Sequence, residues 1–271
     1  MDGVICVLGD AHLDVVVSLT GPFAADTDTS ARTSLGLGGQ AANVAAWVVA
    51  LGGRSRLIAA TATDLAARLV ASELRGRGIE LVGPVVEGRT GVIVALSDGG
   101  SQRSMLTDRG VGPLLTAGAV EPGWLADCSW LHLPAYSLTS EPVLGAALAA
   151  AQAARGQSTC KVSVDLSSVA AISEFGVGAF RGLIAELAPD VVFGNQAEVE
   201  LVGAVDGLVV TKLGADGVLV DGRHYPAEPT EPADATGAGD AFAAGYLVGG
   251  VALGLQAAAR AVARIGAMPC R

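Results

Sequence analysis

The chain has 271 residues, enough for one large α/β domain or two small ones. Hydrophobic residues make up 51% of it and charged residues 16%, which is too apolar for a disordered chain. A formal net charge of -10 excludes a broad nucleic-acid or anionic-membrane surface, because either needs clustered Lys and Arg. We therefore expect a packed globular protein that holds any anionic ligand at one local site.

The N-terminus and the cysteines indicate a reducing compartment. The chain runs almost at once into the apolar stretch 4–8, without a basic region or a small-residue cleavage site. Four cysteines lie far apart in sequence and show no C-x-x-C spacing: Cys6, Cys128, Cys160 and Cys270. We expect free thiols and a cytoplasmic location.

The elements expected along the chain alternate between strands and helices. A first strand at 4–8 is followed by a glycine-rich turn and helix over 38–51, a strand at 57–60 and a helix at 64–77. Later strands are expected at 130–133, 162–165, 191–193, 208–211 and 217–220, with helices at 142–154 and from 238. This alternation predicts an α/β fold with a largely parallel sheet.

Two segments break the alternation, at 14–37 and about 90–106. The second alternates apolar and polar residues around a turn at 98–100, which is typical of a hairpin. We expect both segments to form strands outside the main sheet, where they would act as a lid over its carboxyl edge.

The stretch 241–259 has no charged residue and is about as long as a membrane span. Its glycines and alanines dilute the hydrophobicity, Gln256 interrupts it, and no aromatic belt or basic flank marks an interface. A helix buried in a large α/β core is the better interpretation.

The motif with the clearest chemistry is Asp-Ala-Thr-Gly-Ala-Gly-Asp at 234–240, followed by an apolar helical run. Small residues at a helix start let backbone N–H groups approach an anion, so the motif predicts a phosphate site. Asp240 is placed to accept a proton from a hydroxyl group. The local pattern alone is equally consistent with an N-capping Asp after a tight turn.

Two further motifs favour a site for hydroxyl groups. Gly38 and Gly39 allow a ligand close to the backbone, and Asn43 offers both a donor and an acceptor. Asp10 and Asp14 follow the first strand, where open α/β sheets place ligands. Each motif by itself fits an ordinary turn about as well.

In this order, the three motifs resemble the ribokinase-like (PfkB) family, with its early Gly-Asp and following Asp, its Gly-Gly-x-x-x-Asn and its late Asp-Thr-Gly-Ala-Gly-Asp. Asn195-x-x-Glu198 resembles the family's magnesium and phosphate motif, and the segment 211–217 resembles its nucleotide-binding turn. The resemblance covers nearly the whole chain. It implies one three-layer α/β/α domain over residues 1–271, with a small β-strand lid, and transfer from ATP with Mg²⁺.

The resemblance also implies roles for individual residues. Asp240 would be the catalytic base, above an anion hole of Gly237, Ala238 and Gly239. The sugar or nucleoside would be bound by Asp14, Gly38, Gly39, Asn43 and Arg109. The nucleotide and Mg²⁺, largely through water, would be bound by Asn195, Glu198, Thr211, Gly214 and Gly217. Asp234 and Thr236 match positions near a monovalent-cation site in many relatives, as does the backbone around 264–270, so activation by K⁺ is implied.

Some segments depart from the family pattern. The chain is short between residues 198 and 208, where a helix is usual, and between 245 and 266, where relatives contact adenine. Residues 61–64 read Thr-Ala-Thr-Asp in place of a small-Gly-Asp-Asp segment. A compact kinase and a degenerate sugar-binding or regulatory protein with little activity are both consistent with these departures.

Among kinases, the run 38–47 and the segments 89–91 and 108–110 resemble bacterial relatives proposed to act on pseudouridine or ribose, so the resemblance favours such an acceptor. A phosphosugar is less favoured, because no cluster of basic residues is evident to hold a second phosphate, although an isolated Arg could do so. A dinucleotide-binding oxidoreductase is set aside, because Gly9 to Asp14 lacks Gly-x-Gly-x-x-Gly. No P-loop sequence is present. Dimerisation through the lid strands is an expectation from the family alone.

Overall fold

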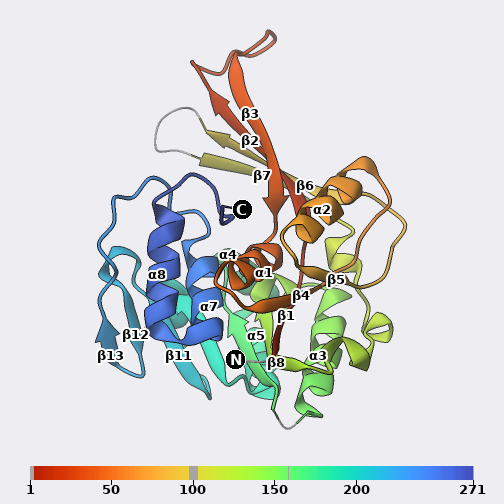
Figure 1. Cartoon of the computed structure of the whole chain (residues 1–271), viewed down its shortest axis with the longest axis vertical. Helices are drawn as coiled ribbons and strands as arrows, with labels where there is room; N and C mark the ends of the chain where they lie inside the picture. Colours follow the sequence, from red (N-terminus) through yellow and green to blue (C-terminus); the bar gives the residue numbers. More distant parts are fainter. Residues whose placement is uncertain (1–2, 98–102, 158, 271) are drawn as a thin grey trace.

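The computed structural model describes residues 3–97, 103–157 and 159–270. Within these residues the strands form two sheets, one of nine strands and one of four (Figure 1). The turn expected at 98–100 lies outside the described residues. The larger sheet is the centre of the molecule, and the smaller sheet projects from one end of it (Figure 1).

The central sheet has the strand order β13-β12-β11-β10-β9-β8-β1-β4-β5. Its strands are β1 (Val4–Leu8), β4 (Arg54–Ile58), β5 (Glu80–Val82), β8 (Cys128–Pro134), β9 (Lys161–Asp165), β10 (Val191–Asn195), β11 (Leu208–Lys212), β12 (Val218–Val220) and β13 (Arg223–Tyr225). Pairing is parallel from β11 to β5, and β12 and β13 add an antiparallel edge. Because the parallel strands point the same way, their carboxyl ends meet at one edge.

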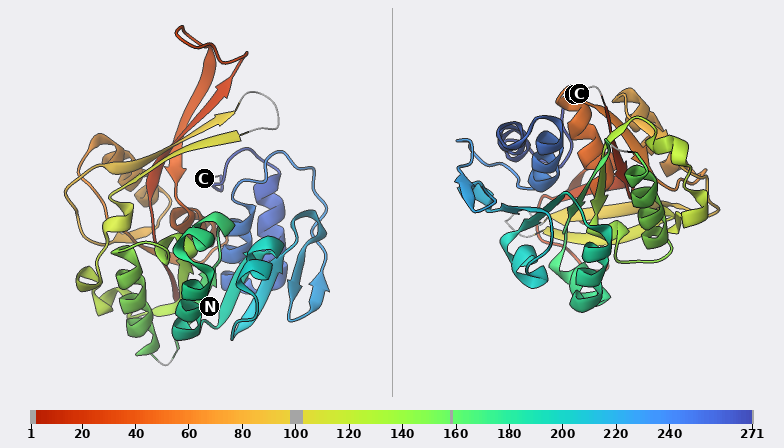
Figure 2. Two further views of the ribbon diagram at one scale, coloured as in Figure 1. Left: turned by 180° about the vertical axis from the view of Figure 1, so that it is seen from behind. Right: turned by 90° about the horizontal axis from the view of Figure 1, so that it is seen from below.

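Helices cover both faces of this sheet and complete three layers (Figure 2). The helices are α1 (Gln40–Ala50), α2 (Leu65–Gly76), α3 (Val143–Arg155), α4 (Val169–Phe175), α5 (Val177–Leu187), α6 (Gln196–Val202), α7 (Ala238–Gly249) and α8 (Val251–Val262). One buried cluster joins the sheet to α3, α4, α5 and α6, and the other joins it to α1, α2, α7 and α8. Crossover helices on both faces are the usual cover of a parallel sheet.

The second sheet has the order β3-β2-β6-β7 and is built from two hairpins. Its strands are β2 (His12–Leu19), β3 (Ala31–Gly38), β6 (Thr90–Ser97) and β7 (Arg103–Gly110). Parallel pairing of β2 with β6 joins the hairpins into one sheet. The prediction of strands outside the main sheet is confirmed, but β7 extends beyond the expected limit at 106 and contains Arg109.

The stretch 241–259 is not one helix, as the sequence suggested, but parts of two. Helix α7 ends at Gly249, and α8 begins at Val251. Between them, Gly250 has a φ of 83°, in the left-handed region that glycine adopts readily. The two helices pack against each other and the sheet, and most of the α7 side chains are buried. Among the described residues, no helix combines the length and apolar character needed to cross a membrane.

The other predicted elements are found with shifts of a few residues at their ends. The sequence analysis missed β5, β13 and the helix pair α4 and α5. It also described the segment after residue 198 as short where a helix is usual, and the structure places the seven-residue helix α6 there, beginning at Gln196. Short edge strands and short helices carry too little periodicity to stand out in a sequence.

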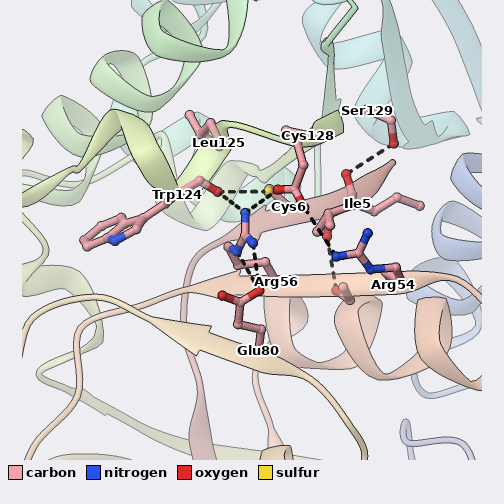
Figure 3. Close-up of polar contacts among 12 residues, drawn as sticks. Ile5, Cys6, Arg54, Arg56, Glu80, Trp124, Leu125, Cys128 and Ser129 are labelled. Carbon is pink, nitrogen blue, oxygen red and sulfur yellow. Dashed lines mark hydrogen bonds and ion pairs between the residues drawn. The ribbon is translucent and has the colours of Figure 1, made fainter. Parts of the chain in front are cut away.

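A buried cation, Arg56 on β4, ties together the amino ends of three strands (Figure 3). Its Nε donates to Glu80 Oε2 at 2.9 Å, and its Nη1 donates to Asp127 Oδ1 at 2.9 Å and to the carbonyl of Trp124. Although burial by itself lowers the pKa of Arg56, the hydrogen bonds that it donates to the two carboxylates raise its pKa overall. The guanidinium therefore stays charged and anchors the loop that leads into β8.

Candidate active site

A cleft of about 750 Å³ lies where the carboxyl ends of the parallel strands meet the start of α7 and the second sheet. It gathers most of the site residues predicted from sequence: Asp14, Gly39, Asn43, Arg109, Asn195, Glu198, Gly214, Thr236, Ala238, Gly239 and Asp240. The other five do not line it: Gly38, Thr211, Gly217, Asp234 and Gly237. Motifs that are more than 200 residues apart in the chain therefore share one site.

The first turn of α7 forms one wall of this cleft. Gly237 precedes the helix in a left-handed conformation, with φ 76°, and the first helical bond runs from Ala241 N–H to its carbonyl at 2.9 Å. The N–H groups of Gly239 and Asp240 consequently have no acceptor within the helix. Such unpaired donors, with the positive end of the helix dipole, make an anion site.

The carboxylate of Asp240 stands beside these donors and accepts a 2.8 Å hydrogen bond from Nδ2 of Asn43. The residue keeps part of its surface open to the cleft, but the carboxylate itself lies deep in the protein. Burial raises its pKa to about 7, and the charge of Asp165 adds to the increase, while Asn43, Lys212 and Gln40 oppose it. A carboxylate with such a pKa is suited to general base catalysis near neutral pH.

Glycines make room for a second carboxylate, Asp14 on β2. A Cβ on Gly38 would lie only 2.0 Å from Asp14 Oδ1, so a larger residue there would displace the Asp14 carboxylate. The next residue, Gly39, has φ 102° and directly precedes α1, which carries Asn43. The predicted Gly-Gly therefore positions both hydroxyl-binding side chains, although only Gly39 lines the cleft.

Three buried oxygen atoms in the cleft lack a hydrogen-bond donor among the described residues: Asp14 Oδ1, Gln40 Oε1 and Asn43 Oδ1. Nδ1 of His12 is 3.1 Å from Asp14 Oδ1, in an arrangement that does not make a hydrogen bond. A buried acceptor without a donor costs free energy, so these atoms call for a ligand that donates several hydrogen bonds. Hydroxyl groups of a sugar or nucleoside meet that need.

Asn195 and Glu198 begin helix α6 as a capping box. Asn195 Oδ1 accepts from Glu198 N–H at 2.9 Å, and Glu198 Oε2 accepts from Asn195 N–H at 2.8 Å. Burial raises the pKa of Glu198. Both residues line the cleft, and the remaining oxygen lone pairs of their side chains can bind Mg²⁺ through water molecules. Among the described residues, no three acidic, His or Cys side chains form a complete metal cage, which is usual where phosphates supply the remaining ligands.

The segment 211–217 forms the turn between β11 and β12. Leu213 N–H donates to Gly217 O at 2.8 Å, and the short η5 helix (Gly214–Asp216) closes the turn. Gly214 lines the cleft, whereas Thr211 and Gly217 belong to the turn but do not line the cleft. Gly217 is at φ 92°, with the carbonyl of Tyr225 where a Cβ would be.

Asp234 and Thr236 link the loop before α7 to the end of the chain. Asp234 Oδ1 accepts from the N–H and the hydroxyl of Thr236, and Oδ2 accepts from Gly266 N–H at 2.9 Å. These contacts bring the predicted K⁺-binding loops together, next to the anion site.

Arg109 is held at the opposite end of the cleft from α7. Its Nε and Nη2 donate to the two carboxylate oxygens of Asp10, at 2.6 and 3.1 Å. Nη2 also donates to the carbonyl of Tyr136, at 3.1 Å. Arg109 does reach the cleft, as predicted, but its charge is neutralised there by a bidentate partner.

Sequence reasoning missed an ion pair in the cleft between Lys212, the last residue of β11, and Asp165, the last residue of β9. Lys212 Nζ donates to Asp165 Oδ2 at 2.7 Å, and the Asp165 side chain is only 1% exposed. The available signal was the position of both residues at the carboxyl ends of predicted parallel strands, where sites occur.

Comparison with known proteins identifies the family of this chain. The family model of the pfkB family carbohydrate kinases matches residues 3–271. The chain therefore belongs to the PfkB carbohydrate kinases, and it is a phosphotransferase of that class.

Individual relatives differ in their acceptors. The chain is 29% identical to an ATP-dependent ribose-1-phosphate kinase of Halopiger xanaduensis, over 88% of this chain and 82% of the relative. It is 27% identical to a fructokinase of Escherichia coli, over 98% and 90% of the two chains. A putative ribokinase II of E. coli, solved with ATP and Mg²⁺, superposes with a TM-score of 0.81 at 22% identity and covers 98% and 94% of the chains.

Proposed function

We propose that this protein transfers the γ-phosphoryl group of ATP to a hydroxyl group of an uncharged sugar or nucleoside. The observation that carries the proposal is the position of Asp240. Its carboxylate, with a pKa raised to about 7, lies between the anion site of α7 and the unpartnered acceptors Asp14 Oδ1 and Asn43 Oδ1. A base between a hydroxyl site and a phosphoryl site is the arrangement that phosphoryl transfer requires.

The charges of the cleft favour an uncharged acceptor. Among the described residues that line it, the Lys and Arg side chains are Lys212 and Arg109, and each is paired with a carboxylate. The acceptor end instead offers Asp14 and neutral amides, which would repel a phosphate and bind hydroxyl groups. This favours ribose, fructose or a nucleoside such as pseudouridine over ribose 1-phosphate.

The chemistry then follows from the side chains. Asp14, Asn43 and Gln40 hold the acceptor by its hydroxyl groups, and Asp240 takes the proton of the attacking hydroxyl. The free N–H groups of Gly239 and Asp240 stabilise charge on the transferring group. Mg²⁺, bound through Asn195 and Glu198, would neutralise charge on the phosphates.

We assign the second sheet to the role of a lid in the same domain. Its strands β2 and β7 contribute Asp14 and Arg109 to the cleft, so a movement of this sheet would open or close the acceptor site. Its edge strands also leave room for a second copy of the chain. The K⁺ requirement stays a prediction that rests on Asp234 and Thr236.

The test is ATP turnover with Mg²⁺, with and without K⁺, on ribose, fructose, adenosine, uridine, pseudouridine and ribose 1-phosphate. We expect ADP release that depends on an uncharged acceptor. The matched variants are Asp240→Asn, which should abolish turnover, and Glu228→Gln, at an exposed acid, which should not change it. A preference for ribose 1-phosphate would contradict the neutral acceptor, and sugar binding without turnover would make the protein a degenerate binding member.

Asp14→Asn tests the acceptor site separately. Losing a charged acceptor for substrate hydroxyls should raise KM for the acceptor by roughly 10- to 100-fold. KM for ATP should stay within about twofold, because Asp14 lies at the far end of the cleft from α6. An equal rise in both constants would contradict the assignment of Asp14 to the acceptor.

A further inference from the structure

The chain has two lysines, and they are in opposite surroundings. Lys161 begins β9 at the amino edge of the sheet and is exposed. Lys212 ends β11 at the carboxyl edge, and its side chain is 18% exposed. Three adjacent parallel strands end in Asp165, Asn195 and Lys212, so Lys212 lies within the row of polar groups that borders the cleft.

The ammonium group of Lys212 lies against the anion site of α7. A Cβ built on Gly239 would be 3.2 Å from Nζ, so the amine packs directly on the backbone of the first helical turn. The Gly at this position is what allows that approach. The lysine charge and the free N–H groups of Gly239 and Asp240 therefore lie side by side.

The N–H donors of Lys212 are only partly used by hydrogen bonds to other residues. Among the described residues Nζ has one hydrogen-bond acceptor, Asp165 Oδ2, although an ammonium group carries three N–H donors. Three carboxylates surround it electrostatically: Asp165, Glu198 and Asp240. Burial alone lowers the pKa of Lys212, but the attraction to these carboxylates raises it overall, so the amine is charged at neutral pH.

We propose that Lys212 is a catalytic residue whose free N–H donors bind the transferring phosphoryl group, and that Asp165 is a positioning residue that holds the amine against α7. The inference rests on the proposed kinase function. Arg109 cannot bind the transferring phosphoryl group, because its ion pair with Asp10 holds it at the other end of the cleft. Lys212 is thus the positively charged side chain that can offset the negative charge of the transferring phosphoryl group next to Asp240.

The first experiment measures turnover and stability of Lys212→Met, Lys212→Arg and the control Lys161→Met. Losing a donor to the transferring group should lower kcat by about 10²-fold or more, with KM for the acceptor nearly unchanged. Arg should recover part of the rate, and Lys161→Met should match the wild type. Wild-type-like kcat in Lys212→Met would overturn this inference alone, whereas a wild type without turnover on any acceptor would overturn the proposed function with it.

A double variant separates catalysis from folding. Lys212→Met leaves the charge of Asp165 buried and unpaired, which destabilises the protein. Adding Asp165→Asn removes that charge and keeps the Oδ1 atom that accepts from Ser167 N–H. We expect the double variant to regain most of the unfolding midpoint while kcat stays about 10²-fold low. Recovery of kcat together with stability would show that the pair is structural and overturn the inference.

A readout without turnover completes the test. Selective ¹⁵N labelling of lysine gives two side-chain signals in the intact chain, one for each lysine. Addition of ATP with Mg²⁺ should shift the Lys212 signal and leave that of Lys161 unchanged. If ATP binds, as measured by calorimetry, and the Lys212 signal does not move, the lysine does not contact the phosphates and the inference fails.

Discussion

The protein buries one cation at each edge of its central sheet, and the two are used differently. At the amino edge, Arg56 donates to Glu80 and to the carbonyl of Trp124 (Figure 3). It also donates to Asp127. At the carboxyl edge, Lys212 has one protein acceptor and a cleft in front of it. A cation bound by several protein acceptors stabilises the fold, and one with a single protein acceptor is available to a ligand.

The same contrast holds for the carboxylates. Glu80 and Asp127 are about half exposed, at 53% and 45%, so water solvates them on their free side. The carboxylate of Asp240 lies deeper, and burial raises its pKa to about 7. The carboxyl edge of the sheet thus holds a carboxylate, Asp240, in a buried position that is unfavourable for the stability of the fold. Such positions are common where function requires them.

The largest expected effect is that of Asp240→Asn. Loss of the base should lower kcat by about 10³-fold. Stability should not fall, because the substitution removes a carboxylate that is costly to ionise and keeps an oxygen for Asn43. Steady-state kinetics and urea unfolding at pH 8 check both statements. A large loss of stability would show that the contact of Asp240 with Asn43 serves mainly the fold.

Arg56→Met should have the opposite profile. Three hydrogen bonds that involve a charged group are lost, and the Trp124 carbonyl keeps only the weak thiol donor of Cys6, so the free energy of unfolding should fall by roughly 2–3 kcal/mol. Urea unfolding measures the loss. The kcat of the folded fraction should match the wild type, and a fall in kcat at unchanged stability would break the distinction between the two edges.

The pH dependence of the rate should report Asp240. A base with a pKa of about 7 is protonated below that value, so kcat/KM for the acceptor should fall about tenfold per pH unit below pH 7 and level off above it. Asp165 raises this pKa, and Lys212, Asn43 and Gln40 lower it. Lys212→Met should therefore move the limb to higher pH. A rate independent of pH from 5.5 to 8 would contradict the assignment.

Asp240 also affects stability in a defined direction. Its folded pKa is raised from the ordinary 3.8, so between about pH 4 and 7 the folded state holds a proton that the unfolded state has released. Its contribution to stability therefore decreases as pH rises through this interval. Comparing the pH dependence of unfolding of the wild type and Asp240→Asn isolates it, and identical curves would count against the raised pKa.

The smallest expected effect is that of Glu80→Gln. Glu80 is half exposed, and Arg56 keeps Asp127 and the Trp124 carbonyl, so the free energy of unfolding should fall by less than about 1 kcal/mol. Added salt should reduce the difference further. A loss as large as that of Arg56→Met would mean that Glu80 supplies most of the anchoring at the amino edge.

The sequence by itself determined the class of the fold and most of the members of the site. Apolar runs alternating with helices predicted the parallel sheet, because side-chain periodicity is a local property. The motifs around Asp14, Asn43 and Asp240 predicted the chemistry through their combination and order, because each by itself fits an ordinary turn or helix cap about as well. The resemblance to a kinase family followed from those same residues.

Tertiary structure decided what depends on contacts distant in sequence. Gly250 divides one apolar stretch into two helices through a positive φ that the sequence does not reveal. Arg109 is neutralised by Asp10, 99 residues away, and Lys212 meets Asp165 across the end of β10. How a charged side chain is held depends on which neighbours the fold supplies. Only the structure shows that Arg109 is bound by both carboxylate oxygens of Asp10, whereas Lys212 has a single hydrogen-bond acceptor among the described residues.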